Sequence, residues 1–305
     1  MSRIDVIIPA RNESEGIAEV CRRVIEHTGQ APIVVDDGSD DGTGELAAAA
    51  GARVIRHPYP KGNGAAIKAG ARSSDADVLI FMDGDGQHDP ADIPRLLSLL
   101  DEGFDLVVGA RTRRQDQASL PRYLANWAYN RISSWLAGQR VADLTSGFRA
   151  ARRVPFMEIL PLLPNGFSYP TTSTMAFYRA GHSVTYLPIA VAQRDQPGTS
   201  HIRPIRDGAR FFTIIFKVVT LYSPLKVFAP ASAALFAAAL SYYAYTYLSD
   251  GRFTNMGVLL FVSAILVFLI GLIAEQITML THLQLHGRGR PTPPPEDQHG
   301  TDERP

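Results

Sequence analysis

Cysteine is almost absent from this sequence: its 305 residues include one, Cys21, so no disulfide bond can form within the chain. Net charge is absent as well, because 30 basic residues balance 30 acidic ones. No overall field therefore draws the protein to nucleic acid or to a strongly charged substrate. Residues 1–5 carry charges where a signal peptide would need an apolar stretch. We therefore expect the first part of the chain to stay in the cytoplasm, where a free thiol is compatible with a reducing environment.

Two long apolar stretches near the C-terminus stand out from this balanced composition. The first, residues 227–248, is about 22 residues long, which as a helix spans roughly 33 Å and matches the hydrocarbon core of a bilayer. The second, residues 256–280, is interrupted only by Glu275 and Gln276. A buried core helix can also be apolar, but two such stretches joined by a short turn favour a transmembrane hairpin.

Basic residues flank the hairpin at its two ends. The turn between the stretches has only Arg252 beside Asp250, whereas the outer flanks carry Arg203, Arg206, Arg210, Lys217, Lys226, Arg288 and Arg290. Positive charge marks the cytoplasmic side of a membrane protein. The pattern predicts a multi-pass protein of the inner, cytoplasmic membrane with both termini in the cytoplasm.

Segment 203–224, just before the hairpin, has basic residues at helical spacing and Ile205, Phe212 and Phe216 on the other side. This pattern predicts an amphipathic helix lying in the membrane interface, and an ordinary surface helix is the alternative. We assign residues 225–282 to the hairpin. The proline-rich, charged segment 283–305 is expected to be a disordered tail.

Short β-rich runs alternate with helix-like segments over the first part of the chain. Several of the runs end in turns rich in Asp, Gly or Asn; they cover residues 5–9, 32–36, 52–57, 77–82 and 105–109. The alternation predicts an α/β fold with one mixed, mainly parallel sheet, in a domain that we place at residues 1–202. Between residues 110 and 200 the pattern fixes no element boundaries. Ligands of such sheets bind beyond the carboxyl ends of the strands, where these turns fall.

The turn at residues 83–90 carries the sharpest chemical signal. Asp83 and Asp85 follow a β-like run, and two carboxylates one residue apart at the end of a strand can reach one hard divalent cation. A diphosphate would complete the octahedron. Acidic turns are frequent and often merely solvated, so the neighbouring turns must support this interpretation.

Two further turns provide that support. Residues 36–43 are acidic and glycine-rich, so their carboxylates can accept hydrogen bonds from a ribose or a base, while Asp40 or Asp41 is also expected to cap the next helix. Residues 57–64 place Lys61 and flexible glycines near a helix start, which suits an anionic ligand.

Together these turns resemble glycosyltransferase family 2, and within it the dolichol-phosphate mannose synthase and polyprenyl-phosphate glycosyltransferase group. The resemblance covers nearly the whole chain up to the hairpin and implies a glycosyltransferase A-type, Rossmann-like domain. It implies that the nucleoside of a UDP- or GDP-sugar is held by Pro9, Arg11, Asn12, Glu13, Asp36 and Asp37, with Lys61 and Gly62 beside the base. It further implies that Asp83, Asp85 and Gln87 hold Mg2+ or Mn2+ with the donor diphosphate.

The resemblance also implies an acceptor side. Asp143 and Arg149 match a segment that lines it, and residues 194–201 resemble a phosphate-binding loop with an extra residue before Gly198 and a histidine in place of a common lysine. From these matches Asp85, Asp143, Arg149 and Arg194 are expected to serve catalysis. The acceptor phosphate is expected to contact Arg149, Arg194, Ser200 and His201. A solvated loop is the alternative for His201.

The acceptor segment has no obvious general base. A hydroxyl acceptor needs one, whereas a phosphate monoester, with a second pKa of about 6, is already ionised at neutral pH. This favours a phosphate acceptor. The resemblance further implies inverting transfer of a hexose-type sugar to an undecaprenyl or dolichyl phosphate in cell envelope glycan biosynthesis. Nucleic acid is not an expected partner, and a homo-oligomer is allowed.

Three alternatives remain open at this point. A nucleotidyltransferase would also use metal-bound carboxylates on a similar sheet, and a family 2 enzyme could use a different acceptor, although the processive Gln-x-x-Arg-Trp pattern is absent. A non-catalytic nucleotide-sugar-binding subunit is the third. Glu275 within the second apolar stretch is expected to pair with a basic residue of the interfacial helix or to reach water.

Overall fold

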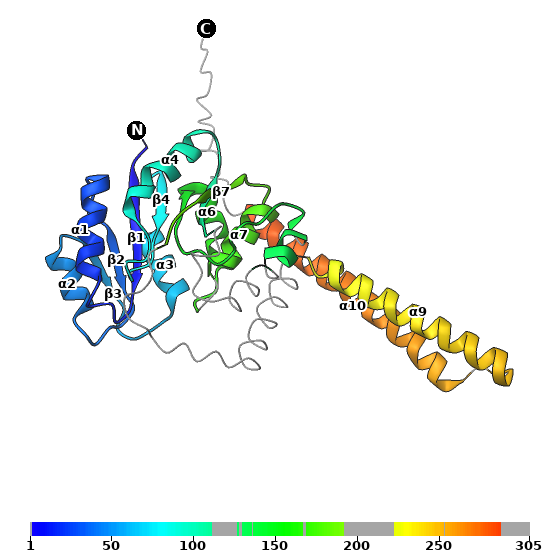
Figure 1. Cartoon of the computed structure of the whole chain (residues 1–305). Coiled ribbons are helices and arrows are strands. Elements are labelled where there is room, and N and C mark those ends of the chain that lie inside the picture. Colours follow the sequence, from blue (N-terminus) through cyan, green and yellow to red (C-terminus); the bar gives the residue numbers. More distant parts are fainter. Residues whose placement is uncertain are drawn as a thin grey trace, which may run out of the picture.

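A sheet of seven strands lies at the centre of the protein (Figure 1). The computed structural model describes residues 2–111, 127, 130–135, 137–166, 169–191, 223–252 and 254–287. The strand order is β3-β2-β1-β4-β6-β5-β7. The bounds are β1 Ile4–Ala10, β2 Ile33–Asp36, β3 Arg53–Arg56, β4 Val78–Phe81, β5 Leu106–Ala110, β6 Arg149–Arg152 and β7 Val184–Pro188. Of these strands, β6 alone runs antiparallel to its neighbours, so the predicted mixed, mainly parallel sheet is confirmed.

Helices cover both faces of the sheet. One core layer joins the sheet to α1 (Ile17–Thr28), α2 (Thr43–Ala49) and α4 (Ile93–Asp101), and the other joins it to α3 (Asn63–Arg72), α6 (Arg153–Ile159) and α7 (Tyr169–Arg179). Two short 3-10 helices, η1 (Pro90–Asp92) and η3 (Leu160–Leu162), precede α4 and follow α6. Strand β4 contributes to both core layers. Leu79 and Phe81 pack in the layer with α3, α6 and α7, and Val78 and Ile80 pack in the layer with α1, α2 and α4. A parallel strand that is buried on both faces reads as a continuous apolar run.

The five predicted strands agree with the structure to within about one residue at each end. The stretch without predicted boundaries contains β6, β7, α6 and α7. Strand β6 has the sequence Arg-Ala-Ala-Arg, which includes no β-branched residue, yet it pairs with β4 on one side and β5 on the other. Its strand conformation comes from these two neighbours rather than from its own propensity.

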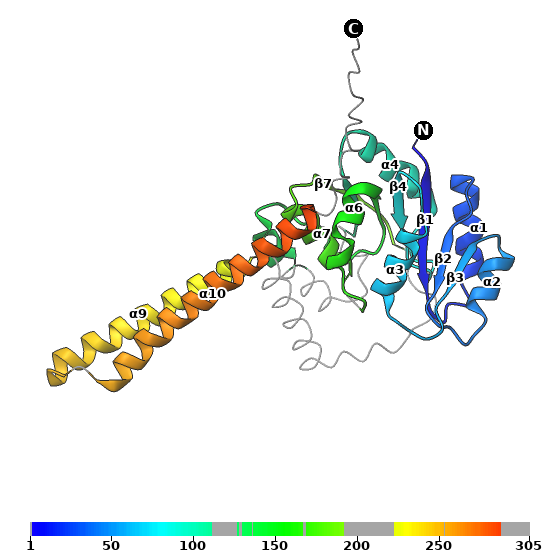
Figure 2. The same cartoon turned by 180° about the vertical axis from the view of Figure 1, so that it is seen from behind.

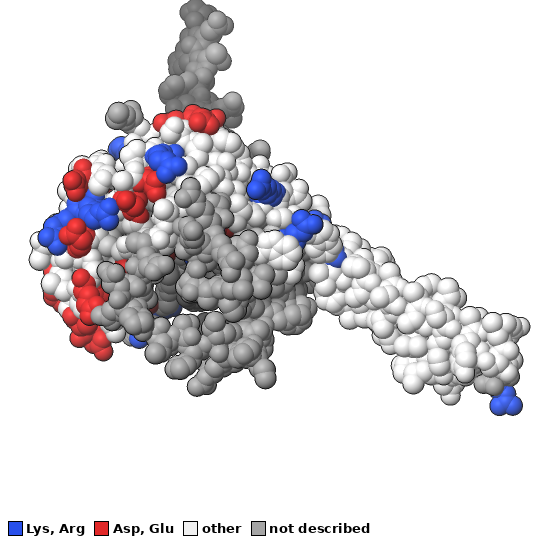
Figure 3. Space-filling view, viewed as in Figure 1, with Lys and Arg blue, Asp and Glu red and all other residues white. Residues whose placement is uncertain are grey.

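The C-terminal helices form an antiparallel hairpin that projects from the α/β domain (Figures 1 and 2). Helix α9 spans Leu225–Asp250 and α10 spans Asn255–Gly287. Each helix contains an apolar stretch long enough to cross a membrane, with a mean hydropathy of 1.4 in α9 and 2.9 in α10. Only 11% of the stretch in α9 and 17% of that in α10 is buried within the protein. Their large apolar side chains are mostly exposed, and on the face shown in Figure 3 almost no charged residue interrupts them. A core helix would be buried, so the alternative of two core helices is excluded.

The predicted hairpin of two apolar helices is therefore confirmed, with small differences at its ends, whereas its crossing of the membrane with both termini in the cytoplasm stays a prediction. Helix α9 begins at Leu225, and α10 continues to Gly287, five residues into the segment expected to be the tail. Residues 203–222 and 288–305 lie outside the described residues, so the interfacial helix and the rest of the tail stay predictions.

Candidate active site

The predicted donor turns meet at one edge of the sheet. Ala10 at the end of β1 pairs with Asp36 at the end of β2, and Asp36 pairs with Arg56 at the end of β3. On the other side, Phe81 at the end of β4 pairs with Arg149 at the start of β6. Because parallel strands place their carboxyl ends together, turns that are far apart in the sequence become neighbours.

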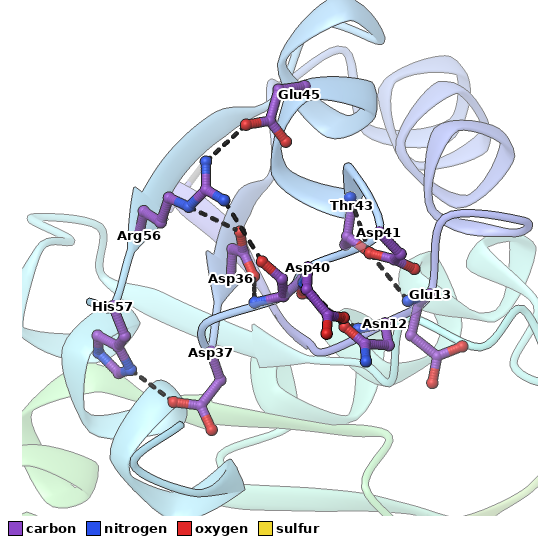
Figure 4. A network of polar contacts seen from close by, with 11 residues as sticks. Asn12, Glu13, Asp36, Asp37, Asp40, Asp41, Thr43, Glu45, Arg56 and His57 are labelled. Carbon is purple, nitrogen blue, oxygen red and sulfur yellow. Dashed lines mark hydrogen bonds and ion pairs between the residues drawn. The ribbon is translucent and has the colours of Figure 1, made fainter. Parts of the chain in front are cut away.

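Asp37 organises the turn at residues 57–62 (Figure 4). Its Oδ1 accepts hydrogen bonds from His57 Nδ1 (2.7 Å) and the Lys61 amide (2.8 Å), and its Oδ2 accepts one from the Gly62 amide (2.7 Å). Desolvation raises the pKa of the Asp37 carboxyl, but the hydrogen bonds from His57, Lys61 and Gly62 outweigh it, so this pKa lies below its ordinary value. The ionised carboxylate thus holds Lys61 and Gly62 beside the predicted nucleoside site.

His57 was not predicted as a site residue. It is buried at the end of β3 and its Nδ1–H donates to the Asp37 carboxylate. A histidine at the carboxyl end of a predicted parallel strand, next to an acidic turn, is the sequence signal that would have found it.

Asp36 differs from Asp37 although the two are adjacent. Its side chain is fully buried, Oδ1 accepts from the Ser39 amide (2.9 Å), and Oδ2 lies 3.5 Å from Arg56 Nε. Arg56 also pairs with Glu45 at 2.5 Å (Figure 4). In this arrangement Asp36 shapes the turn from inside and offers no exposed surface to a nucleoside, unlike the direct contact that was expected.

The first two turns are joined by hydrogen bonds. Asn12 has a left-handed backbone (φ 54°), and its Oδ1 accepts from the Asp40 amide (3.2 Å). The Glu13 amide donates to Thr43 Oγ1 (2.9 Å). The predicted cap is displaced: Gly42 is the N-cap of α2, while Asp41 Oδ1 accepts from the Thr43 amide (3.1 Å). These contacts place Asn12 and Glu13 against the acidic turn, beside Pro9 and Arg11.

The start of α3 serves packing rather than an anionic ligand. The Gly64 amide donates to Gly166 O (3.2 Å), and the Ala65 amide donates to Asn165 O (2.9 Å). Lys68 Nζ adds a bond to Leu163 O (3.1 Å). The prediction that this helix start binds an anion is wrong for these two amides, because carbonyl groups of the protein already occupy them.

The acidic turn after β4 is held at both ends. Asp83 Oδ2 lies 3.5 Å from Nε2 of His88, which is buried and stacks on Phe148 at 5.2 Å between centroids. Asp85 Oδ1 accepts from the Gln87 amide (3.1 Å). Farther along, Asp89 caps η1 and pairs with Arg23 at 2.7 Å. The Asp83 side chain is 37% exposed, so a ligand can reach it.

The donor set of this turn suits a hard cation. Asp83, Asp85 and Gln87 offer carboxylate and amide oxygens, which Mg2+ and Mn2+ prefer over nitrogen or sulfur. Within the described part of the chain, no group of three or more His, Cys, Asp or Glu side chains has metal-binding geometry. The two carboxylates and one amide oxygen of this turn are the ligand types of a Mg2+-type ion, which takes few protein ligands and completes its shell with water and substrate phosphate.

Asp143 is engaged with Arg111. Its two oxygens accept from Arg111 Nε (2.7 Å) and Nη2 (3.0 Å), and further bonds come from the Thr145 and Ser146 amides. Burial raises the pKa of Asp143, but the hydrogen bonds and the charge of Arg111 outweigh it, so the pKa is lowered. Asp143 therefore remains an ionised partner that orients a guanidinium at the end of β5.

Arg111 was missed by the sequence analysis. It directly follows β5, and its side chain is 23% exposed at the edge that carries Asp83. Its position two residues beyond the predicted run 105–109 is the signal that would have identified it.

Arg149 lies behind the site. Its guanidinium is fully buried, and Nη1 donates to Pro170 O (2.9 Å), Ser173 Oγ (2.7 Å) and Thr174 Oγ1 (3.2 Å). Nη2 donates to Ser146 O. The predicted direct contact with an acceptor phosphate does not match this arrangement, because no part of the side chain reaches the surface. Arg194, Ser200 and His201, the other predicted acceptor residues, lie outside the described residues.

Comparison with known proteins decides the family. Residues 5–160 match the family described as glycosyl transferase family 2, and residues 223–280 match the GtrB C-terminal hairpin. The chain belongs to glycosyltransferase family 2. It is a membrane-associated glycosyltransferase whose two apolar helices form the hairpin.

Two curated proteins are among those that are similar to this chain. A dolichyl-phosphate hexose transferase of Haloferax volcanii is 32% identical over 216 residues, which cover 70% of this chain and 92% of that protein. A polyprenol monophosphomannose synthase of Mycolicibacterium smegmatis is 35% identical over 211 residues, covering 62% and 77%. Among solved structures, glucosyl-3-phosphoglycerate synthase from Mycobacterium tuberculosis with Mn2+, UDP-glucose and phosphoglyceric acid is 25% identical, with a TM-score of 0.53 and coverage of 72% and 79%.

Proposed function

We propose that this family 2 glycosyltransferase moves a hexose-type sugar from a UDP- or GDP-sugar to a polyprenyl phosphate, with inversion, at the cytoplasmic face of a membrane. The observation that carries this proposal is the presence, in one chain, of an accessible acidic turn at the carboxyl edge of the sheet and an apolar hairpin at the side of the same domain. A soluble acceptor would not require the hairpin. The named acceptors of the two curated relatives are consistent with this lipid.

The donor side follows from the turns at the sheet edge. Asp37 fixes Lys61 and Gly62 where a nucleoside would lie, with Asn12 and Glu13 on the neighbouring turn. Asp83, Asp85 and Gln87 would hold Mg2+ or Mn2+, which when bound would neutralise charge on the departing nucleoside diphosphate. The neighbouring structure with Mn2+ and UDP-glucose supports this choice of donor and ion.

The acceptor side follows from Arg111. Its guanidinium is oriented by Asp143 and its side chain is 23% exposed, which suits contact with a lipid phosphate. A phosphate oxygen would form a bond to the anomeric carbon while the bond from that carbon to the diphosphate oxygen breaks. The nucleoside diphosphate then leaves from the opposite face, and configuration inverts. The acceptor has a second pKa of about 6, so it is ionised without a general base.

A single reconstitution tests the proposal. Purified full-length protein is incubated with a short-chain polyprenyl phosphate and a panel of UDP- and GDP-sugars, with and without Mn2+, and both products are identified. We expect a glycosyl phospholipid and a nucleoside diphosphate. Asp85→Asn should lower turnover by about 100-fold or more, because one charge-stabilising group of the transition state is lost.

The matched control is Asp101→Asn, which makes the same change at an exposed position at the end of α4. Full turnover after thorough chelation, or transfer to a neutral alcohol alone, contradicts the proposal. Release of pyrophosphate instead indicates a nucleotidyltransferase. A binding subunit without catalysis would show no turnover and would keep its biological effect in Asp85→Asn.

A further inference from the structure

Glu275 connects the hairpin to the catalytic domain. Its Oε1 accepts a hydrogen bond from Arg179 Nη2 (3.0 Å), and its Oε2 accepts one from the amide of Leu225, the first residue of α9 (3.2 Å). The described partner thus belongs to α7 of the α/β domain, and not to the interfacial helix that was expected to supply it. One carboxylate thereby contacts three helices: α7, α9 and its own α10.

Both charges lie where helix dipoles stabilise them. Arg179 is in the last turn of α7, at the negative end of that helix, and Glu275 lies against the positive, N-terminal end of α9. The side chains are 31% and 25% exposed, so the pair is neither fully solvated nor sealed. It lies at the base of the hairpin, where Val227 of α9 also packs against the domain core.

The opposite end of α7 contacts the candidate active site. Tyr169 Oη donates to Gly147 O (3.1 Å), and Pro170 O and Ser173 Oγ accept from the buried Arg149. Gly147 lies so close to Asp83 that a Cβ on it would overlap the carboxylate. Helix α7 has 11 residues. It is therefore about 16 Å long, with the acidic turn at one end and the hairpin at the other.

We propose that the Arg179–Glu275 ion pair is a positioning contact that sets the active site at the height of the lipid headgroups. This inference rests on the proposed function, because only a lipid acceptor needs that height. A polyprenyl phosphate is confined to the membrane surface, so its phosphate reaches Asp83 and Arg111 only if the domain is held correctly over the hairpin. The nucleotide-sugar arrives from water and has no such requirement.

The expected signature is a difference between acceptors. A misplacement of about 1 Å can lower a rate by about 100-fold, so even a modest loosening of the pair should reduce turnover on a membrane-bound acceptor. A water-soluble acceptor can diffuse to the site whatever the orientation of the domain. A partly exposed ion pair contributes little to folding stability, so the variants should remain folded.

The experiment compares two acceptors with the full-length protein. One is a long-chain polyprenyl phosphate in phosphatidylcholine–phosphatidylglycerol vesicles that hold the enzyme, and the other is a short isoprenyl phosphate that dissolves in water. We expect Arg179→Gln and Glu275→Gln each to lower kcat for the vesicle-bound acceptor by about tenfold. The kcat for the soluble acceptor and the KM for the donor should stay within about twofold. The double variant should be no worse than either single variant, because both remove the same contact.

Two controls separate positioning from other effects. Arg179→Lys keeps the charge and should recover most of the vesicle activity, whereas Arg22→Gln breaks an exposed pair with Glu19 on α1 and should change nothing. An equal loss on both acceptors, or no loss on either, overturns the inference. If the wild-type protein glycosylates neither phosphate, the proposed function fails and this inference fails with it.

Discussion

At the scale of single residues, burial separates side chains that look equivalent in the sequence. Arg111 directly follows β5 and Arg149 begins β6. Both arginines interact electrostatically with Asp83 and Asp143. Arg149 is buried under α7 and holds the loop at Ser146, whereas the side chain of Arg111 is partly exposed. The available surface, and not the residue type, makes Arg111 the better candidate for contact with a phosphate.

Asp143→Asn is expected to change the acid sensitivity of the protein. Burial raises the pKa of Asp143, yet the hydrogen bonds and charge of Arg111 lower it overall. A carboxyl with a lowered folded pKa stabilises the protein fully above its ordinary pKa of about 3.9, and this stabilisation is lost as pH falls through the lower folded value. At neutral pH the free energy of unfolding of the variant should be about 1–3 kcal/mol lower than that of the wild type, because Arg111 keeps only part of its hydrogen bonds.

The measurement is thermal unfolding in detergent from neutral pH to about pH 2, across the ordinary carboxyl pKa. The wild-type melting temperature should fall more steeply with acid than that of the variant, and Asp101→Asn should follow the wild type. A variant with the wild-type acid slope would show that Asp143 is not the linked group.

At the scale of elements, the contact between α3 and residues 163–166 explains why Gly62 and Gly64 are glycines, in a turn where the sequence suggested a ligand site. Gly62 has φ 102°, which favours glycine, and a Cβ on Gly64 would overlap the Pro164 carbonyl oxygen. The helix thus approaches a backbone segment about 100 residues away more closely than any side chain would allow.

Gly64→Ala is expected to destabilise the protein by about 1–2 kcal/mol. Alanine improves helix propensity by up to about 1 kcal/mol, but overpacking against backbone atoms costs about 1–3 kcal/mol and should outweigh it. Gly166→Ala, on the other side of the same contact, meets no atom within 4 Å and should be nearly neutral. Chemical unfolding of both variants checks this, and equal stabilities would contradict the role of close approach.

At the scale of the whole molecule, the hairpin and the α/β domain require different solvents. Large apolar side chains are exposed along α9 and α10, while the sheet buries its own behind helices on both faces. An exposed apolar surface of this size is stabilised where lipid covers it, which agrees with the membrane association of the protein.

Phe268→Arg is expected to weaken the association of the protein with membranes. Phe268 is exposed near the middle of the apolar part of α10, where an arginine costs about 2.5–3.5 kcal/mol. Met256→Arg makes the same change near the start of the helix, where the side chain can reach water, and should be tolerated. The membrane-bound fraction after an alkaline wash measures both, and equal retention would argue against a membrane-crossing α10.

The sequence by itself determined the parts of this protein that depend on local pattern. The apolar runs of the first five strands and the lengths of the two apolar stretches were sufficient to predict the sheet and the hairpin, and the acidic turn at Asp83 was placed at the edge where the parallel strands end. Parallel topology then places the turns together without further information, because every such strand ends at the same edge.

Only the tertiary structure decided which of these residues are buried and which remain accessible. The burial of Asp36 and Arg149, the strand β6, and the pairing of Glu275 with Arg179, 96 residues away, arise from elements that meet only after the chain has folded. The free energy of such contacts depends on desolvation and distance between groups remote in sequence, and no local pattern encodes either quantity.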